Sequence, residues 1–199
     1  MTDTTTQKRG ADHLVDGLAA LGIDTVYSLS GNQIMPVYDA LIGSGLRLVH
    51  TRHEAAAVHM AEADAQLTNR VGIALLTAGP GFANGLSAIF TAQQTQTPVL
   101  VHTGDAPLAR DGPGAFQEMD QLTAAGAFAK ASIKLARAED AFDLIRDAAA
   151  FARGGTPGPV HISLPDDVLR KTTGRNGARR NPALARTEPA STGPVARIA

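Results

Sequence analysis

The chain has 199 residues, of which 44% are hydrophobic and 19% are charged, and its formal net charge is −1. This composition indicates one globular domain of ordinary size with a short appendage, and it excludes an intrinsically disordered chain. Cysteine is absent, which excludes both a disulfide framework and a thiolate metal site.

The first nine residues are polar and are expected to form a flexible N-terminus. They lack the apolar core of a secretory signal peptide, and no apolar run in the sequence approaches the length that spans a bilayer. We therefore expect a cytoplasmic protein that makes no contact with a membrane.

Apolar residues at helical spacing begin the ordered part of the chain. Leu14, Val15 and Leu18 share one face of a predicted helix over residues 11–21, which Gly22 ends. Segments typical of strands and helices then alternate over short loops. The predicted strands are 25–29, 46–50, 71–76, 99–102 and 159–165, and the further predicted helices are 34–42, 54–67, 85–94 and 138–152.

This alternation predicts an α/β fold of three α/β/α layers, in which helices cover both faces of a mostly parallel, doubly wound sheet. We assign residues 10–170 to this domain. The strands of such a sheet end at one edge, and ligands bind there. Residues that directly follow the strands are therefore the first candidates for a functional site.

The composition changes after this domain, to a segment rich in Gly, Arg, Asn and Pro that predicts a basic linker over 171–192. From Arg170 onward there are seven Lys and Arg residues and one acidic residue. A basic tail can bind nucleic acid, but no aromatic side chain here offers a base a stacking surface. We favour a solvated linker and no nucleic-acid partner. Residues 193–199 resemble the first turn of a truncated central domain, so we expect the chain to be a piece of a longer protein; a frayed terminus is the alternative.

One acid, Glu54, stands where a predicted strand gives way to a helix, and three alanines follow it. One interpretation is a carboxylate that the positive end of the helix dipole stabilises. The other is a functional acid in a buried site, because the neighbouring alanines cannot solvate it. The residues alone leave both interpretations open.

A glycine-rich turn, Gly79-Pro80-Gly81, follows the next strand, and glycine lets a ligand approach the backbone closely. A dinucleotide site would have the pattern G-x-G-x-x-G, but Asn84 stands in place of the third glycine. Asp105 follows the next strand, roughly where a ribose-binding acid would stand. A non-catalytic nucleotide-binding or regulatory module is therefore the alternative function.

Four motifs, in this order, resemble the pyrimidine-binding domain of thiamine-diphosphate enzymes and are most similar to the acetolactate synthase branch. They are the run from Arg52 to Glu62, Gly79-Pro80-Gly81 with Asn84, the run from Ala115 to Asp120, and the run from Pro157 to Pro165. The resemblance covers almost all of residues 10–170. It implies a thiamine-diphosphate-dependent lyase or transferase that decarboxylates or ligates a 2-oxo acid or a similar acyl donor.

The resemblance also assigns catalytic residues. In the family a glutamate meets N1′ of the aminopyrimidine and favours the imino tautomer, whose nitrogen removes the C2 proton of the cofactor; Glu54 matches that glutamate. Gln117 would face the substrate. Its neighbour Phe116 has two interpretations, a site residue or a core residue.

The same resemblance assigns cofactor-binding residues beside Glu54. Pro80 and Asn84 would lie against the pyrimidine ring, and Gly31 and Asn32 would line the neighbouring wall.

The histidines do not form a predicted metal site. His53 and His59 are six residues apart, so they do not share a helical face, and we expect structural or interface roles for both. His102 and His161, at or within predicted strands, are expected to be satisfied locally.

In the family, Mg²⁺ holds the diphosphate on a second domain that carries Gly-Asp-Gly and a later asparagine. This chain contains no Gly-Asp-Gly, so no metal ligand is assigned in it. Active sites of the family form between the pyrimidine domain of one subunit and the diphosphate domain of another, which implies a homodimer or tetramer. The resemblance leaves dependence on FAD open and assigns no residue to it.

Overall fold

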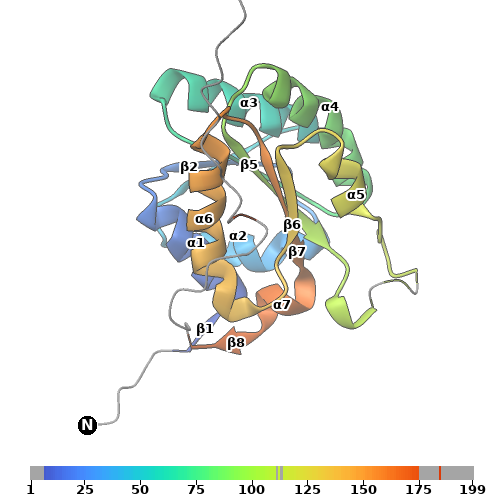
Figure 1. Cartoon of the computed structure of the whole chain (residues 1–199). Helices are drawn as coiled ribbons and strands as arrows, with labels where there is room; N and C mark the ends of the chain where they lie inside the picture. The colour runs from blue at the N-terminus through green and yellow to red at the C-terminus, as the bar shows by residue number, and fades with distance from the viewer. Residues whose placement is uncertain (1–6, 111, 113, 175–183, 185–199) are drawn as a thin grey trace, which may run out of the picture.

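The computed structural model describes residues 7–110, 112, 114–174 and 184. Its centre is a six-stranded parallel sheet with the strand order β3-β2-β4-β5-β7-β6 (Figure 1). The strands are β2 (Thr25–Ser28), β3 (Arg47–His50), β4 (Gly72–Leu76), β5 (Val99–Asp105), β6 (Ala131–Lys134) and β7 (Val160–Pro165). The predicted parallel α/β sheet is confirmed.

Helices cover both faces of this sheet. One layer contains α1 (Gly10–Ala20), α2 (Met35–Leu41) and α6 (Ala141–Arg153), and the other contains α3 (Glu54–Thr68), α4 (Pro80–Gln94) and α5 (Gln121–Gly126) (Figure 1). Along β4, Ile73 and Leu75 join the core under the first layer, and Ala74 and Leu76 join the core under the second. Successive side chains of a strand point to opposite faces, so an entirely apolar strand seals both cores.

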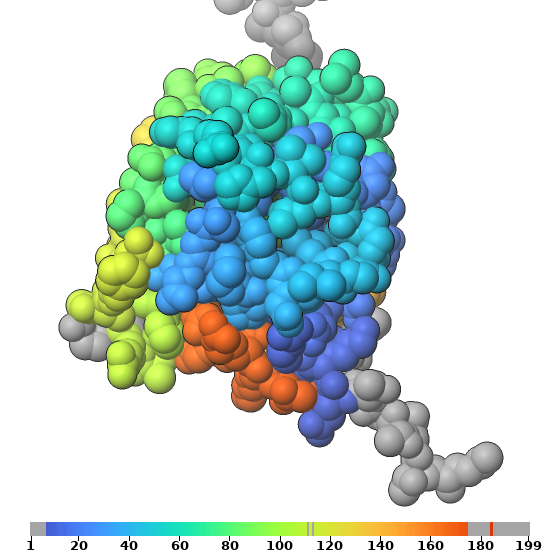
Figure 2. Space-filling model, turned by 180° about the vertical axis from the view of Figure 1, so that it is seen from behind, coloured from blue at the N-terminus to red at the C-terminus, as the bar shows by residue number. Residues whose placement is uncertain are grey.

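Several short elements escape the sequence prediction. They are α5, β6, the helix α7 (Asp166–Arg170) and the antiparallel pair of β1 (Lys8–Arg9) with β8 (Thr172–Thr173). Elements of two to six residues are too short to show a hydrophobic period. In β6, for example, only Ile133 is fully buried. Figure 2 shows α7 (orange) beside α2 (blue), with which it is in contact.

The β1–β8 pair changes both predicted limits of the domain. Lys8 and Arg9 belong to a strand, not to a flexible N-terminus, and the ordered segment continues past residue 170 to Thr173. Leu184, within the predicted linker, is buried in the core under α1 and α6. The other residues of the predicted linker beyond 174 and the predicted truncated turn at 193–199 lie outside the described residues.

The strand order reverses beside β2. The chain passes from β2 outward to β3 and then returns to form β4 on the other side of β2. In open α/β sheets, ligands bind outside the carboxyl ends of the strands at such a switch point. Among the described helices, none combines the length and the apolar character needed to cross a membrane.

Candidate functional site

Glu54 is the first residue of α3, at the carboxyl edge of the sheet. His53 caps the helix, because its Nδ1 accepts a hydrogen bond of 3.1 Å from the backbone N–H of Ala55. The cap fixes where α3 begins and so fixes the position of the acid. Glu54 is only 8% exposed. Its Oε2 accepts a hydrogen bond of 3.0 Å from Nδ2 of Asn84.

The glycine-rich turn is shorter than predicted, because α4 begins at Pro80 and not at Gly85. A proline fits the first turn of a helix, where its missing N–H leaves no hydrogen bond unmade. The early start makes Gly81 and Asn84 part of the helix, one turn apart. A Cβ on Gly81 would lie 2.5 Å from Cγ2 of Thr77 and 3.1 Å from Oε1 of Glu54. The carboxylate therefore lies directly against this first turn.

The loop after β2 forms the neighbouring wall of the site. A Cβ on Gly31 would lie 2.2 Å from Oγ1 of Thr77, so only glycine allows the loops after β2 and β4 to meet. Thr77 donates a hydrogen bond of 3.0 Å from Oγ1 to Oε1 of Gln33, which is 5% exposed. Gln33 and Thr77 are not among the residues predicted from the sequence, although both stand in the loops that follow predicted strands. Asn32 is exposed in this loop.

Gln117 reaches the site from a distant loop. A Cβ on Gly79 would lie 2.5 Å from the backbone oxygen of Gln117 and 3.1 Å from its Cβ. Gln117 has a left-handed backbone with φ of 59°, which is uncommon for a residue other than glycine. Glu118 holds this loop by accepting a hydrogen bond of 2.7 Å from the backbone N–H of Ala115. Phe116 is 74% exposed, so its interpretation as a core residue is wrong.

The structure therefore brings the predicted site residues to the carboxyl edge of the sheet, where β2 and β4 end. The side chain of Glu54 is buried there, whereas Asn32, Pro80 and Asn84 are exposed. Gly31 and Gln117 join it through their contacts with Thr77 and Gly79. This arrangement can hold a flat polar ring against glycine backbone, with one acid beneath the ring and one amide beside the acid. The roles of the individual residues toward a cofactor stay predictions.

Asp105 does not fit the ribose-binding role of the alternative interpretation. It is 2% exposed and accepts hydrogen bonds from Ser163 Oγ and, over 2.8 Å, from the backbone N–H of Ala106. Nζ of Lys134 lies 3.2 Å from the same carboxylate. These contacts occupy both oxygens, and Asp105 has a structural role at the ends of β5 and β7.

The histidines also have local roles. Nδ1 of His59 lies 3.3 Å from Oε2 of Glu62, and both ring nitrogens of His161 have hydroxyl partners. His102 is satisfied only in part, because Nε2 has no partner among the described residues. Burial lowers the pKa of His102 to about 4, and burial together with the charge of His102 lowers the pKa of His161 to about 3. Within the described ranges, no cluster of three or more His, Asp or Glu side chains is arranged to hold a metal ion.

Comparison with known proteins agrees with this geometry. Residues 8–124 match the family described as thiamine pyrophosphate enzyme, N-terminal TPP binding domain. The chain is 38% identical over 167 residues to 2-hydroxyacyl-CoA lyase 2 of Homo sapiens, which is 84% of this chain and 26% of that protein. It is 39% identical over 160 residues to the acetolactate synthase large subunit of Mycobacterium tuberculosis, which is 80% of this chain and 29% of that protein. The chain thus spans between a quarter and a third of the length of the curated relatives that it matches.

Proposed function

This chain belongs to the thiamine pyrophosphate enzyme family through its N-terminal TPP-binding domain, as the sequence motifs indicated, and we propose that Glu54 is the acid that activates the cofactor there. The observation that carries the proposal is the setting of Glu54. The carboxyl group is buried at the carboxyl edge, accepts a hydrogen bond from Asn84 and lies against Gly81. A carboxyl group so enclosed can exchange a proton with a ring nitrogen without competition from bulk water.

The surrounding residues are proposed to bind and orient the aminopyrimidine ring. Asn84 orients Glu54, so that Oε1 is left for the ring nitrogen. Gly31, Asn32 and Pro80 form the walls against which the ring packs. Gln117 faces the substrate side of the crevice. When bound, thiamine diphosphate would stabilise a negative charge on the former carbonyl carbon of the substrate.

The diphosphate half of the cofactor needs a second domain. Since this chain has no Gly-Asp-Gly motif, we propose that a diphosphate-binding domain supplies the Mg²⁺ site and closes the crevice from another subunit of a homodimer or tetramer. The exposure of Asn32, Pro80 and Asn84 supports a site that a partner completes. No observation assigns a site for FAD.

The reaction is proposed to make or break a carbon–carbon bond beside a carbonyl group of a 2-oxo acid or a similar acyl donor. Relatives named acetolactate synthase support carboligation of 2-oxo acids. Relatives named 2-hydroxyacyl-CoA lyase support a second candidate, the cleavage of a 2-hydroxyacyl thioester. Both reactions make or break a carbon–carbon bond at a carbonyl carbon, so one set of residues on this chain would serve either.

Glu54→Gln in the intact protein tests the proposal, with Glu62→Gln as the matched control. Both glutamates are buried in α3, at 8% and 6% exposure, but Glu62 lies two turns from the crevice. We expect Glu54→Gln to lower turnover of pyruvate and of a 2-hydroxyacyl-CoA about 10²–10⁴-fold, the usual contribution of a proton-transfer group. Glu62→Gln should keep its turnover per folded molecule. Equal turnover of wild type and Glu54→Gln would remove Glu54 from the mechanism.

Calorimetry separates this function from the alternative, a non-catalytic nucleotide-binding module. An enzyme of this class binds thiamine diphosphate with Mg²⁺ and ignores NAD, whereas a dinucleotide module binds NAD alone. The structural contacts of Asp105 favour the first outcome.

A further inference from the structure

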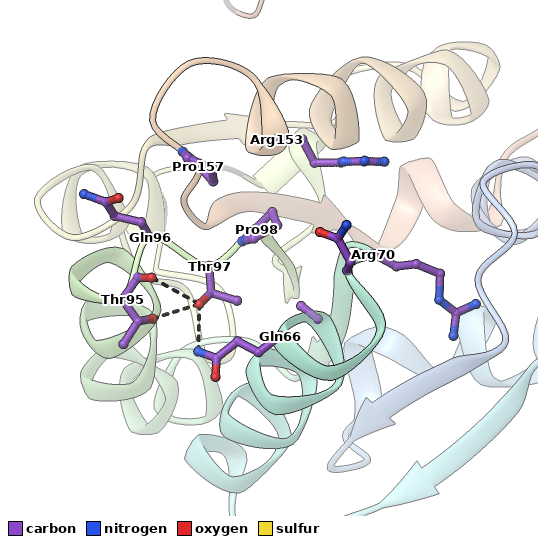
Figure 3. A pocket seen from close by; sticks show the side chains of 10 residues that line it. Gln66, Arg70, Thr95, Gln96, Thr97, Pro98, Arg153 and Pro157 are labelled. Carbon is purple, nitrogen blue, oxygen red and sulfur yellow. Dashed lines mark hydrogen bonds between the residues drawn. The ribbon is translucent and has the colours of Figure 1, made fainter.

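Two adjoining clefts lie at the amino edge of the sheet, opposite the Glu54 crevice. Each has a volume of about 410 Å³. The first is bounded by the ends of α3, α4 and α6, and the second by α6 and the segments before β2 and β4. Arg70 and Arg153 line both, and the two adjoining clefts are together named here the amino-edge cleft; Figure 3 shows the first of them.

One guanidinium group in this cleft is uncommitted. Arg70 donates hydrogen bonds to Asp24 Oδ2 and to the carbonyl oxygen of Gly22, over 2.9 and 2.8 Å. Arg153 is exposed and has neither an ion pair nor a hydrogen bond within the part of the chain that the structure describes. Figure 3 shows Arg153 extending from the end of α6 across one side of the cleft.

Helix capping does not account for Arg153. An arginine in the last turn of a helix can hydrogen-bond the terminal carbonyl groups. In α6 these groups have other partners: the carbonyl of Ala150 accepts from the N–H of Gly154, that of Ala152 from the N–H of Gly158, and that of Phe151 from Nζ of Lys130. The guanidinium is therefore available to a ligand.

The rest of the cleft has a fixed polar side and an apolar side. Gln66 and Thr95 each hydrogen-bond Thr97 over 2.9 Å, which holds the polar floor in place (Figure 3). At its rim the amide groups of Asn69 and Gln96 have no hydrogen-bond partner among the described residues. Leu21, Ile23 and Val71 line the other side, where Arg146 and the carboxylate of Asp147 also stand.

We propose that the amino-edge cleft binds a small metabolite that carries a phosphate or carboxylate group, with Arg153 as the principal ligand of that oxyanion. The planar guanidinium donates two parallel hydrogen bonds to such a group, and the amides of Asn69 and Gln96 offer further donors. Clefts of this combined size suit a mononucleotide or a similar organic anion, whose uncharged part would pack on the apolar side. The site is separate from the Glu54 crevice and does not rest on the proposed function.

Calorimetry on the intact protein tests this, with inorganic phosphate, AMP and citrate as separate probes. We expect at least one probe to bind and Arg153→Gln to weaken it about tenfold or more, the effect of losing one charge-assisted pair. Arg153→Lys keeps the positive charge but loses the planar guanidinium. Its affinity for the probe should therefore lie between that of wild type and that of Arg153→Gln. Tighter binding of AMP than of phosphate would show that the adenine base packs on the apolar side of the cleft. Binding of citrate alone would show that the site prefers carboxylates.

Two controls separate this site from general charge effects and from the proposed catalytic site. Arg110→Gln removes an equally exposed arginine at the opposite edge of the sheet and should leave the affinity unchanged. Glu54→Gln should also leave it unchanged. The proposal is overturned if no probe binds, if Arg153→Gln binds as tightly as wild type, or if Arg110→Gln weakens binding equally.

Discussion

Gly79 and Gln117 contact each other backbone to backbone, although a helix and a strand separate them in the sequence. Gly79 has φ of 54°, and a side chain there would meet the carbonyl oxygen of Gln117 at 2.5 Å. The turn that precedes α4 and the loop that carries Gln117 are thus fitted to each other. The backbone of Gln117 can lie this close to the turn only because Gly79 has no side chain.

Gly79→Ala is expected to separate these two loops. Gly43→Ala is a matched control, since Gly43 also has a positive φ, of 76°, but has nothing within 4 Å of its Cβ position. Both variants incur the cost of a positive φ, which is about 1–2 kcal/mol in the left-handed helical region and larger at Gly79, whose ψ of −109° lies outside that region. Only Gly79→Ala adds a steric clash, which should lower the free energy of unfolding, measured in urea, by about 1–3 kcal/mol more. The clash should also weaken the binding of thiamine diphosphate. Equal stability of the two variants would show that the contact with Gln117 is loose.

Gly81→Ala tests the contact between the first turn of α4 and Glu54. The added methyl group would meet Cγ2 of Thr77 at 2.5 Å, so we expect about a tenfold loss of affinity for thiamine diphosphate, measured by calorimetry. Thr77→Ser removes that Cγ2 and keeps the hydroxyl that bonds Gln33. The double variant should therefore recover most of the affinity. If it does not, the loss comes from the displacement of Glu54.

Much of the fold could be predicted from the sequence, because β4, β5 and β7 are long and buried along their whole length. Short apolar segments bounded by turn residues favour central strands of a doubly covered sheet. The short β6 and α5 could not be predicted, since they carry too few residues for a period. The order of the strands depends on which side of β2 each crossover packs, and no local pattern encodes that choice.

The candidate site could likewise be predicted only in part from the sequence. Glu54 and Asn84 could be placed near each other, because each follows a predicted strand and parallel strands end at one edge. The contact of Gln117 with Gly79 could not be found by such reasoning, since it joins a loop outside any predicted element to the crevice. The start of α4 was misplaced because glycine usually marks a turn, whereas here Pro80 begins the helix and the glycines serve close packing.

Asn84→Asp replaces the donor to Glu54 with a second carboxylate at hydrogen-bond distance, 3.0 Å in the wild type. Two carboxyl groups that share a site cannot both ionise easily, so the pKa of one rises. We expect activity well below that of Asn84→Ala at neutral pH and a partial recovery as the pH is lowered, because the introduced carboxyl group, once protonated, can again donate to Glu54. The pH profile of turnover is the measurement. A profile parallel to that of wild type would show that Asn84 does not orient the acid.

The buried histidines predict how stability depends on pH. His102 and His161 titrate near 6.5 in the unfolded chain but have pKa values of about 4 and about 3 in the folded protein. Between these limits the unfolded state binds more protons, so the free energy of unfolding falls as the pH is lowered from 6.5 toward 4. Each histidine can contribute up to about 1.4 kcal/mol per pH unit in this window.

His102→Gln is expected to remove one of these two contributions. The slope of the free energy of unfolding against pH, measured by urea unfolding between about pH 6 and about pH 4, should then fall to roughly half. His50→Gln, which changes an exposed histidine at the end of β3, is the control and should keep the wild-type slope. The amide of the glutamine can still reach the carbonyl oxygen of Ala74 that Nδ1 of His102 contacts at 3.3 Å, so stability at neutral pH should change little. An unchanged slope in His102→Gln would mean that His102 gains a proton without unfolding, through water that enters between β4 and β5.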